Sequence, residues 1–333
     1  MRRLAALVCS LLFAFGGLAS AQSDLQGYPS KSVTIIVPVA PGGATDIAAR
    51  VVANALSTKW GVPVVTENIS GGAMNIGARR AAISPPDGYT LLVSPPAPVT
   101  FNKLLYSQLG YEPRDFTPIT VLVKTPLALL VRRDLPVNSV QELIAYAKAN
   151  PGKLSFGSSG VGTTLHLAGI RFAQLAGIEL LHSPYRGELL VLNDLMGGHI
   201  DIFFGTLSTA LPFYRAGKLK MLAVAEMERS SAVPEVPTMI EAGVPNFVSF
   251  AWYALVAPPN APKQLQEKIN RDVVAILHDE TIRQKLQPLM LEPVGRSSSA
   301  HRIPRTSSRV KQKFGAVLSR RQKFLHDRWL IAS

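Results

Sequence analysis

Short apolar runs rich in β-branched residues alternate with longer amphipathic segments along most of the chain. The apolar runs have the length of buried strands, and the amphipathic segments space their apolar residues as helices do. The predicted strands are Val33–Val37, Val62–Glu67, Thr90–Ser94, Ile119–Val123, Leu127–Val131, Leu154–Phe156, Ile178–Leu181, Ile200–Phe204, Met221–Ala225 and Phe250–Val256. This alternation is typical of an α/β protein whose parallel sheets carry helices on both faces.

The predicted helices have recognisable beginnings and ends. One follows the first strand, with Ala48, Val52 and Leu56 on one stripe, and another begins with the capping box Ser139-x-x-Glu142. Further helices are predicted at Thr163–Leu175, Glu188–Met196, Ser208–Ala216 and Pro262–His278.

The length predicts two lobes, because about 310 residues after a leader exceed what one hydrophobic core usually holds. The apolar stretches 119–131 and 221–226 are predicted to connect the lobes. This gives lobe 1 as residues 22–122 plus 228–295, and lobe 2 as residues 123–227. A protein connected in this way is hinged, with its ligand cleft between the lobes.

Both ends of the chain differ from the middle. Residues 1–21 have a basic start, a short apolar core and a small-residue site ending at Ala21, which predicts a cleavable signal peptide and a periplasmic protein. A membrane anchor is disfavoured, since spanning takes about 20 apolar residues. The only cysteine, Cys9, lies in this segment, so lipid attachment stays a minor alternative and disulfides are not expected.

The net charge of +13 does not indicate nucleic-acid binding. Arg2 and Arg3 carry two of these charges, and residues 296–333 carry nine, with ten Lys or Arg against Asp327. The body, residues 22–295, is therefore close to neutral, whereas a nucleic-acid-binding domain needs a basic face. Residues 296–333 are expected to be a poorly ordered basic tail, because like charges oppose compaction.

Two strand–glycine–helix junctions carry the strongest functional signal. The first, Ala40-Pro41-Gly42-Gly43, leads into a helix at Ala44, Thr45 and Asp46, and the second runs from Phe156 to His166. Helix starts leave backbone N–H groups unpaired and bear a positive dipole, so they suit anionic ligands. Simple helix capping explains either junction alone, but two junctions in two lobes favour a shared carboxylate site.

Individual side chains at these junctions have alternative interpretations. Asp46 is explained by the helix dipole, or it meets a ligand ammonium, a hydroxyl or a bridging water, since it would repel a carboxylate. Asn75 either caps a helix or donates to a ligand. Thr206 follows a buried strand at the carboxyl edge of the sheet, where ligands of α/β proteins bind.

Catalytic motifs are absent from the sequence. Gly157-Ser158-Ser159-Gly160 lacks the spacing of a nucleophile elbow, and no phosphate-loop or dinucleotide motif occurs. The six histidines never pair at i, i+4, so no zinc signature is present. A serine hydrolase that uses Ser158 or Ser159, with His166 nearby, remains a weak alternative.

At this point the sequence resembles a known family, the tripartite tricarboxylate transporter substrate-binding proteins, or Bug family of Bordetella-type extracytoplasmic receptors. The resemblance covers residues 28–295. It rests on Tyr28-Pro29-Ser30-Lys31, Pro41-Gly42-Gly43-Ala44-Thr45-Asp46, Asn75-Ile76-Gly77-Ala78, Asp87-Gly88-Tyr89-Thr90-Leu91-Leu92, residues 157–167, Pro184-Tyr185-Arg186-Gly187, Ala216-Gly217-Lys218-Leu219, Val236-Pro237-Thr238 and Trp252-Tyr253.

The resemblance implies a type II periplasmic binding protein that closes on a small carboxylate, with no catalysis, cofactor or metal. The ligand-binding residues that it implies are Gly43, Ala44, Thr45, Asp46, Ser159, Gly162, Thr163 and Thr164, with Asn75 and Thr206 less directly. Two features depart from the family: the basic tail replaces an acidic amphipathic helix, and Glu188 stands where a small or polar residue is usual.

The leading hypothesis is therefore a monomeric periplasmic protein that delivers a carboxylate to the permease subunits of a tripartite tricarboxylate transporter. A ligand sensor for a membrane receptor kinase uses the same fold and stays open, as does the hydrolase. Dicarboxylates, citrate-like acids, acidic amino acids and aromatic carboxylates all remain candidate ligands.

Overall fold

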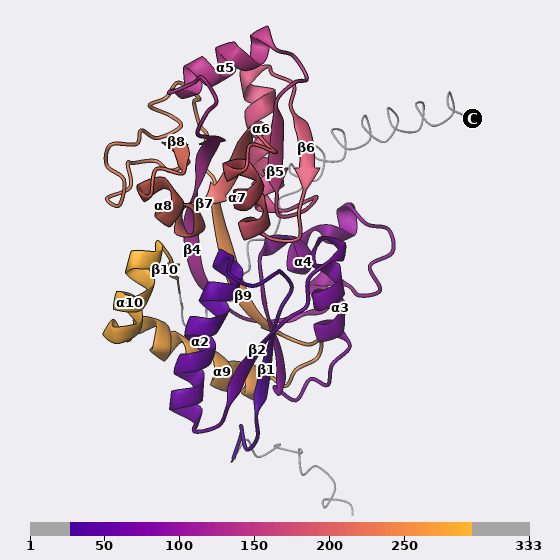
Figure 1. Ribbon diagram of the computed structural model, residues 1–333. Coiled ribbons are helices and arrows are strands. Elements are labelled where there is room, and N and C mark those ends of the chain that lie inside the picture. Colours follow the sequence, from indigo (N-terminus) through magenta and orange to yellow (C-terminus); the bar gives the residue numbers. More distant parts are fainter. Residues whose placement is uncertain (1–26, 295–333) are drawn as a thin grey trace, which may run out of the picture.

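The computed structural model describes residues 27–294 (Figure 1). The predicted signal peptide and basic tail therefore lie outside the described residues. The strands and helices form two bodies, one above the other in Figure 1, and the hydrogen-bonded pairing of strands continues from one body into the other. The strands are β1 (Val33–Val37), β2 (Val64–Asn68), β3 (Thr90–Ser94), β4 (Thr117–Arg132), β5 (Ser155–Ser158), β6 (Leu181–Pro184), β7 (Ile202–Thr206), β8 (Leu219–Val224), β9 (Phe250–Ala257) and β10 (Glu292–Pro293).

The helices follow the strands in α/β order. They are α2 (Ala44–Trp60), α3 (Asn75–Ala82), α4 (Pro96–Thr100), α5 (Val140–Ala149), α6 (Thr164–Ala176), α7 (Glu188–Met196), α8 (Leu207–Arg215), α9 (Lys263–His278) and α10 (Glu280–Leu286). Short 3-10 turns occupy Gly72–Met74, Asn102–Leu104, Pro113–Asp115 and Gln287–Leu289. Among the described helices, none is long and apolar enough to cross a membrane.

Lobe 1 is the lower body in Figure 1, and helices cover its sheet on both faces. Here β1 lies between β2 and β3 and runs parallel to both. Ile35 belongs to the core cluster that contains the apolar stripe of α2, and Ile36 belongs to a second cluster with Ala78 and Ala81 of α3. The uninterrupted apolar run of β1 follows from this, because a strand buried on both faces needs apolar residues at every position.

Lobe 2 is the upper body, and its parallel strands point back toward lobe 1. β5 lies between β6 and β7 and is parallel to both. Each strand is followed by a helix that begins at its carboxyl end, as α6 does after β5 and α8 does after β7. The helix starts of both lobes therefore meet at the junction between the lobes (Figure 1).

The two lobes are joined by β4 and by the chain that returns into β9. Strand β4 pairs with β9 from Thr117 to Pro126 and then with β7 and β8 from Leu127 to Arg132. At the change-over, the Ala225 N–H donates to Leu127 O at 2.8 Å, and the Ser249 N–H donates to Ala225 O at 2.9 Å. These backbone contacts mark the narrow connection about which the lobes can move.

The prediction of parallel sheets was wrong for the connecting strands. β9 runs antiparallel to β3 and β4, and β4 runs antiparallel to β7 and β8. The reason is topological: β4 leaves lobe 1, β9 returns to it, and two adjacent strands that cross in opposite senses must be antiparallel. The separately predicted strands 119–123 and 127–131 are parts of the single strand β4.

For the return to lobe 1, we propose a boundary that differs from the predicted one. The Phe247 ring meets the Phe172 ring of α6 at a centroid distance of 6.5 Å, and Arg171 Nη2 donates to Asn246 O at 2.5 Å. Residues 228–249 therefore contact lobe 2, although the sequence assigned them to lobe 1. We propose that lobe 2 extends to Ser249 and that lobe 1 resumes at Phe250.

Candidate functional site

A small cavity of about 30 Å³ lies between the lobes, and residues from both lobes form its walls. The starts of α2 from lobe 1 and of α6 and α7 from lobe 2 reach it, and so do Met74 and Pro95, the residues that precede α3 and α4. Its lining residues are Val39, Ala40, Gly43, Ala44, Thr45, Met74, Pro95, Ser159, Thr163, Leu165, Gly187, Glu188, Ala251 and Tyr253.

The start of α2 is held in place by Asp46. Its carboxylate accepts hydrogen bonds from the Gly42 N–H, from Arg50 Nε and from Asn68 Nδ2, each at 2.9 Å. Burial would raise the pKa of Asp46, but these donors outweigh it and hold the pKa below its usual range. Gly42 lies at φ +87°, which favours glycine, so the turn is fixed by both backbone and side chain.

The start of α6 forms the opposite wall. Thr163 is the N-cap, and its Oγ1 accepts from the His166 N–H at 3.2 Å and donates to Gly160 O at 2.9 Å. Gly160 and Gly162 have φ of +127° and +87°. A Cβ at Gly162 would collide with Leu105 of lobe 1, so this glycine allows the close approach of the two lobes.

The lobes touch across the cleft in this conformation. The Ala40 N–H donates to Arg186 O, and Tyr106 OH donates to Val161 O, both at 3.3 Å. A Cβ at Gly42 would collide with Leu189 at the start of α7. A cavity of about 30 Å³ holds one or two water molecules. An organic acid of several carbon atoms therefore fits only after the lobes separate.

The predicted site residues divide into two groups. Gly43, Ala44, Thr45, Ser159 and Thr163 line the cavity together. The others lie beside or behind it: Gly162 and Thr164 flank Thr163, and Asp46 is bonded to its own turn.

Asn75 and Thr206 make structural contacts outside the cavity lining. Asn75 Oδ1 accepts from Asn102 Nδ2 at 2.6 Å and from Tyr111 OH at 2.8 Å. Thr206 is fully buried and donates its hydroxyl to Glu188 Oε2 at 2.7 Å. Asn75 thus ties the start of α3 to its neighbours, while Thr206 supports a side chain that itself lines the cavity.

Sequence reasoning noted Glu188 as a departure from the family pattern, but it placed neither Glu188 nor Tyr253 among the ligand-binding residues. Both are buried cavity residues, and burial raises the pKa of each. Tyr253 belongs to a stretch that carries the family resemblance, and Glu188 directly follows another, Pro184-Tyr185-Arg186-Gly187. That adjacency was the available signal, but it does not show which way a side chain points.

A serine–histidine contact exists, although it lies outside the cavity lining. Ser158 Oγ is 2.7 Å from His182 Nε2, and Ser158 is fully buried. The same hydroxyl also bonds with the backbone of Gly160. A nucleophile must reach its substrate, so this arrangement gives no support to hydrolysis at Ser158.

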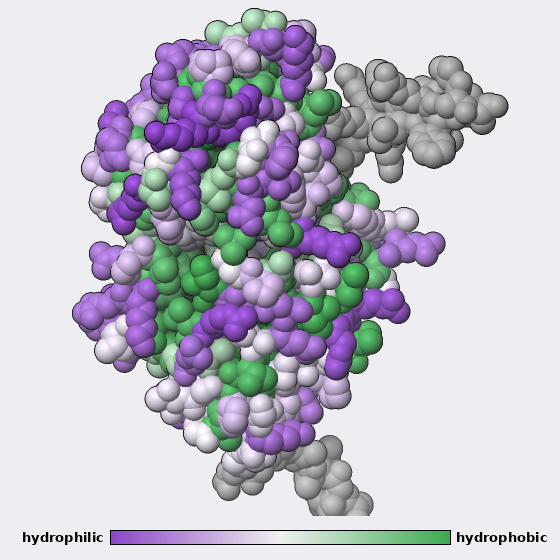
Figure 2. All heavy atoms as spheres, in the orientation of Figure 1, coloured by the Kyte–Doolittle hydropathy of each residue, from purple (hydrophilic) through white to green (hydrophobic). Residues whose placement is uncertain are grey.

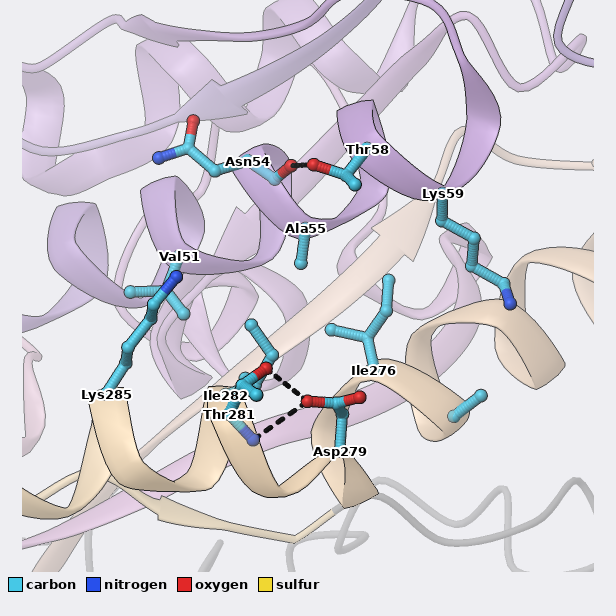
Figure 3. A pocket seen from close by; sticks show the side chains of 11 residues that line it. Val51, Asn54, Ala55, Thr58, Lys59, Ile276, Asp279, Thr281, Ile282 and Lys285 are labelled. Atoms are coloured by element: carbon cyan, nitrogen blue, oxygen red, sulfur yellow. Dashed lines mark hydrogen bonds between the residues drawn. The ribbon is translucent and has the colours of Figure 1, made fainter.

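A larger groove of about 520 Å³ lies on the outer side of lobe 1, between α2, α9 and α10 (Figure 3). Val51, Ala55 and Ile282 form its apolar part, and Lys285 extends from α10 toward Val51. Apolar atoms gather near α2 and α10 in Figure 2. Residues of lobe 2 do not line this groove, and it lies away from the helix starts.

The cleft cavity is therefore the candidate functional site. Its walls provide backbone N–H groups and hydroxyls. Among the described residues, no cluster of three or more His, Cys, Asp or Glu side chains could hold a metal ion.

Two lobes that close on a cavity walled by opposing helix starts define a binding protein of the periplasmic class. The chain belongs to the family described as "Tripartite tricarboxylate transporter family receptor", whose sequence model matches residues 48–319. Protein BugT of Bordetella pertussis is 34% identical over 284 residues, which cover 85% of this chain and 86% of BugT.

Solved structures agree with this assignment. "R. palustris Rpa4515 with adipate" is 34% identical with a TM-score of 0.79, covering 89% of this chain and 96% of that one. "MatC (Rpa3494) from Rhodopseudomonas palustris with bound malate" is 29% identical with a TM-score of 0.76, covering 87% and 96%. The two-lobed α/β fold expected from the sequence is thereby confirmed.

Proposed function

We propose that this protein is a monomeric periplasmic solute-binding protein that captures a small carboxylate and delivers it to the permease of a tripartite tricarboxylate transporter. One observation carries the proposal: the starts of α2 and α6, from different lobes, line the same cavity. Each helix start offers N–H groups without intrahelical partners and a positive dipole end.

In this proposal the carboxylate is held by the backbone N–H groups around Gly43, Ala44 and Thr45 and, across the cleft, by Ser159 and Thr163. Gly162 and Thr164 shape the second wall, because one permits close approach and the other is the first residue of α6. Asp46, Asn75 and Thr206 act indirectly by fixing the positions of the binding groups.

The relatives support the chemistry of the ligand. Two similar proteins have structures with adipate and with malate, which are both small dicarboxylates. The family description supports the transporter as partner, and the similar solved structure "Structure of periplasmic binding protein BugD" supports the periplasm as location. The proposal extends these properties to this chain at the level of ligand class.

The mechanism follows from the connection between the lobes. Rotation about the backbone contacts of Leu127, Ala225 and Ser249 opens the cleft, and a ligand enters between the helix starts. Closure excludes water, which strengthens the hydrogen bonds to the carboxylate in a medium of lower dielectric constant. The closed form, with its changed outer surface, is then the form presented to the permease.

Two measurements test the proposal. Mass spectrometry of small molecules released from the purified protein should identify a carboxylate, and calorimetry should then give a saturable affinity for it. Recovery of no organic acid, together with no heat on titration with adipate, malate or their homologues, would contradict the proposal. Turnover of ester substrates would instead favour the hydrolase, and loss of ligand uptake in cells lacking the protein would favour transport over sensing.

A further inference from the structure

Glu188 places an acidic side chain inside the cleft. Glu188 is the first residue of α7, it is 8% exposed, and it lines the cavity. A Cβ added at Gly43 would lie 3.8 Å from Glu188 Cβ, so the side chain starts directly opposite the first helix of lobe 1. Glu188 is therefore a wall residue of the same small space as the proposed carboxylate-binding groups, and its Oε2 accepts a hydrogen bond from Thr206 just outside the cavity lining.

The groups around Glu188 are hydroxyls. Thr206 Oγ1 donates to Glu188 Oε2 at 2.7 Å, and that hydroxyl lies 2.9 Å from Thr209 Oγ1 and 3.0 Å from Ser208 Oγ. From lobe 1, Tyr253 of β9 faces the cavity and hydrogen-bonds with Thr45 of α2. Of the lining residues, which all belong to the described chain, Glu188 and Tyr253 are the ionisable ones, and none is a Lys, Arg or His.

This environment disfavours a negative charge on Glu188. Burial raises the pKa of Glu188, and the hydrogen bonds from Thr206 and Thr209 offset that effect only in part. The ionised form is stable when a cation enters the cavity, because a buried charge needs an opposite charge as partner. A second carboxylate on the ligand would instead face a carboxyl group at close range and raise its pKa further.

We propose that Glu188 is a specificity-determining residue that selects a ligand with a carboxylate at one end and a protonated amine at the other. The helix starts of α2 and α6 take the carboxylate, and Glu188 takes the amine. This inference rests on the proposed function and narrows its ligand class, with simple dicarboxylates bound more weakly.

Length-matched ligand pairs test the selection. Succinate against 4-aminobutanoate, and adipate against 6-aminohexanoate, replace one carboxylate by an aminomethyl group while keeping the chain. Calorimetric titrations compare the wild-type protein with Glu188→Gln, which keeps the shape of the side chain, and with Glu188→Ser as a second variant. Glu179→Gln is the matched control, because Glu179 is an exposed acid on the same lobe.

The wild-type protein and the control should prefer the amino acid of at least one pair by tenfold or more. Both Glu188 variants should lose at least tenfold of that preference, with melting curves that show them to be folded. An unchanged preference in folded Glu188→Gln, or a wild-type preference for the diacids, would overturn the inference while leaving carboxylate capture intact. Binding of no ligand of either pair would overturn the proposed function and this inference together.

Proton release on ligand binding gives a second test of the role of Glu188. Near or below the raised pKa of Glu188, binding of an amine ionises the carboxyl group and releases a proton. Titrations in buffers of different ionisation enthalpy should show proton release for the wild-type protein and markedly less for Glu188→Gln. Equal proton release by the two proteins would place the titrating group elsewhere and count against Glu188.

Discussion

Two acidic side chains in first helical turns, Asp46 of α2 and Glu188 of α7, belong to opposite lobes and are both buried, yet their surroundings differ. Asp46 is 3% exposed and accepts hydrogen bonds from a guanidinium, an amide and a backbone N–H. Glu188 is 8% exposed and meets hydroxyl groups. Their pKa values move in opposite directions, downward for Asp46 and upward for Glu188.

The difference shows that the position of an acidic residue in the first turn of a helix does not by itself assign its role. Asp46 has its hydrogen-bond partners within its own lobe, so its carboxylate stabilises the turn that precedes α2. Glu188 lines a cavity whose other lining residues carry no positive charge, and its printed hydrogen-bond partner is the Thr206 hydroxyl, so its carboxyl group has no cation partner among the cavity residues. The number and kind of donors distinguish a structural acid from one that is able to select a ligand.

The largest expected effect is on stability. Asp46→Ala leaves the donors of Gly42 and Asn68 without their acceptor, and we expect a loss of about 2–3 kcal/mol in the free energy of unfolding. Glu188→Gln should change it by less than about 1 kcal/mol, because it removes a buried acid that has no cation. Urea unfolding of both variants measures the difference, and equal losses would show that the two acids are alike.

The next effect is on ligand affinity. Thr164→Pro removes one backbone N–H at the first position of α6, where proline is tolerated, and Thr163 already has the extended backbone that must precede proline. The dissociation constant for the carboxylate should rise about tenfold, as for one hydrogen bond to a charged group.

Lys263→Pro is the matched control for that variant. Lys263 is an exposed first residue of α9, and it does not line the cavity. Its substitution should leave the affinity within about twofold, below the effect of a single hydrogen bond. Equal weakening by both prolines would mean that the start of α6 has no special part in binding.

The pH dependence of stability should have opposite signs for the two acids. For Asp46, the unfolded state binds the proton more tightly, so its contribution appears as the pH rises toward about 3.9 and is lost in stronger acid. For Glu188, the folded state binds it more tightly, so stability falls as the pH rises from about 4.3 to the raised pKa.

Melting temperatures of the wild-type protein, Asp46→Asn and Glu188→Gln between pH 3 and pH 8 measure these slopes. The advantage of Glu188→Gln over the wild-type protein should grow from pH 4 to pH 7. A constant difference over that range would mean that Glu188 titrates in the folded protein as it does in the unfolded chain.

The smallest expected effect concerns closure. Leu189 meets Gly42 across the cleft, so Leu189→Ala removes a contact between the two helix starts without touching either acid. Small-angle scattering of the ligand-free protein should show a slightly larger radius of gyration. Leu190→Ala is the control, because the neighbouring Leu190 is 44% exposed and should leave the radius unchanged. Equal scattering from both variants would show that Leu189 does not hold the cleft closed.

Much of the fold could be predicted because its signals are local. The strands β1 and β3 and the helix α7 begin and end at the predicted residues, since apolar runs and glycine turns mark their limits. The course of β4 and the return near Ser249 could not be predicted, because they depend on pairings between residues more than a hundred positions apart. β6 begins at Leu181, where the predicted strand ended. The apolar residues Ile178 and Leu180, which suggested a strand, are buried in the core but precede β6.

The site was predictable where it consists of backbone and unpredictable where it depends on side-chain direction. The helix starts at Gly43 and Thr163 were expected, and both line the cavity. Asn75 was expected there too, but Asn102 and Tyr111 engage its side chain. The partners of Glu188 come from the end of β7 and the first turn of α8, so its burial is visible only in the folded protein.

A crystal structure of the protein with its own ligand, identified from the purified sample, tests the central claim most directly. The account predicts the ligand carboxylate within hydrogen-bonding distance of the N–H groups that follow Gly43 and of Ser159 or Thr163 across the cleft. A ligand in the outer groove between α2 and α10, or held by one lobe alone in a closed molecule, would contradict it.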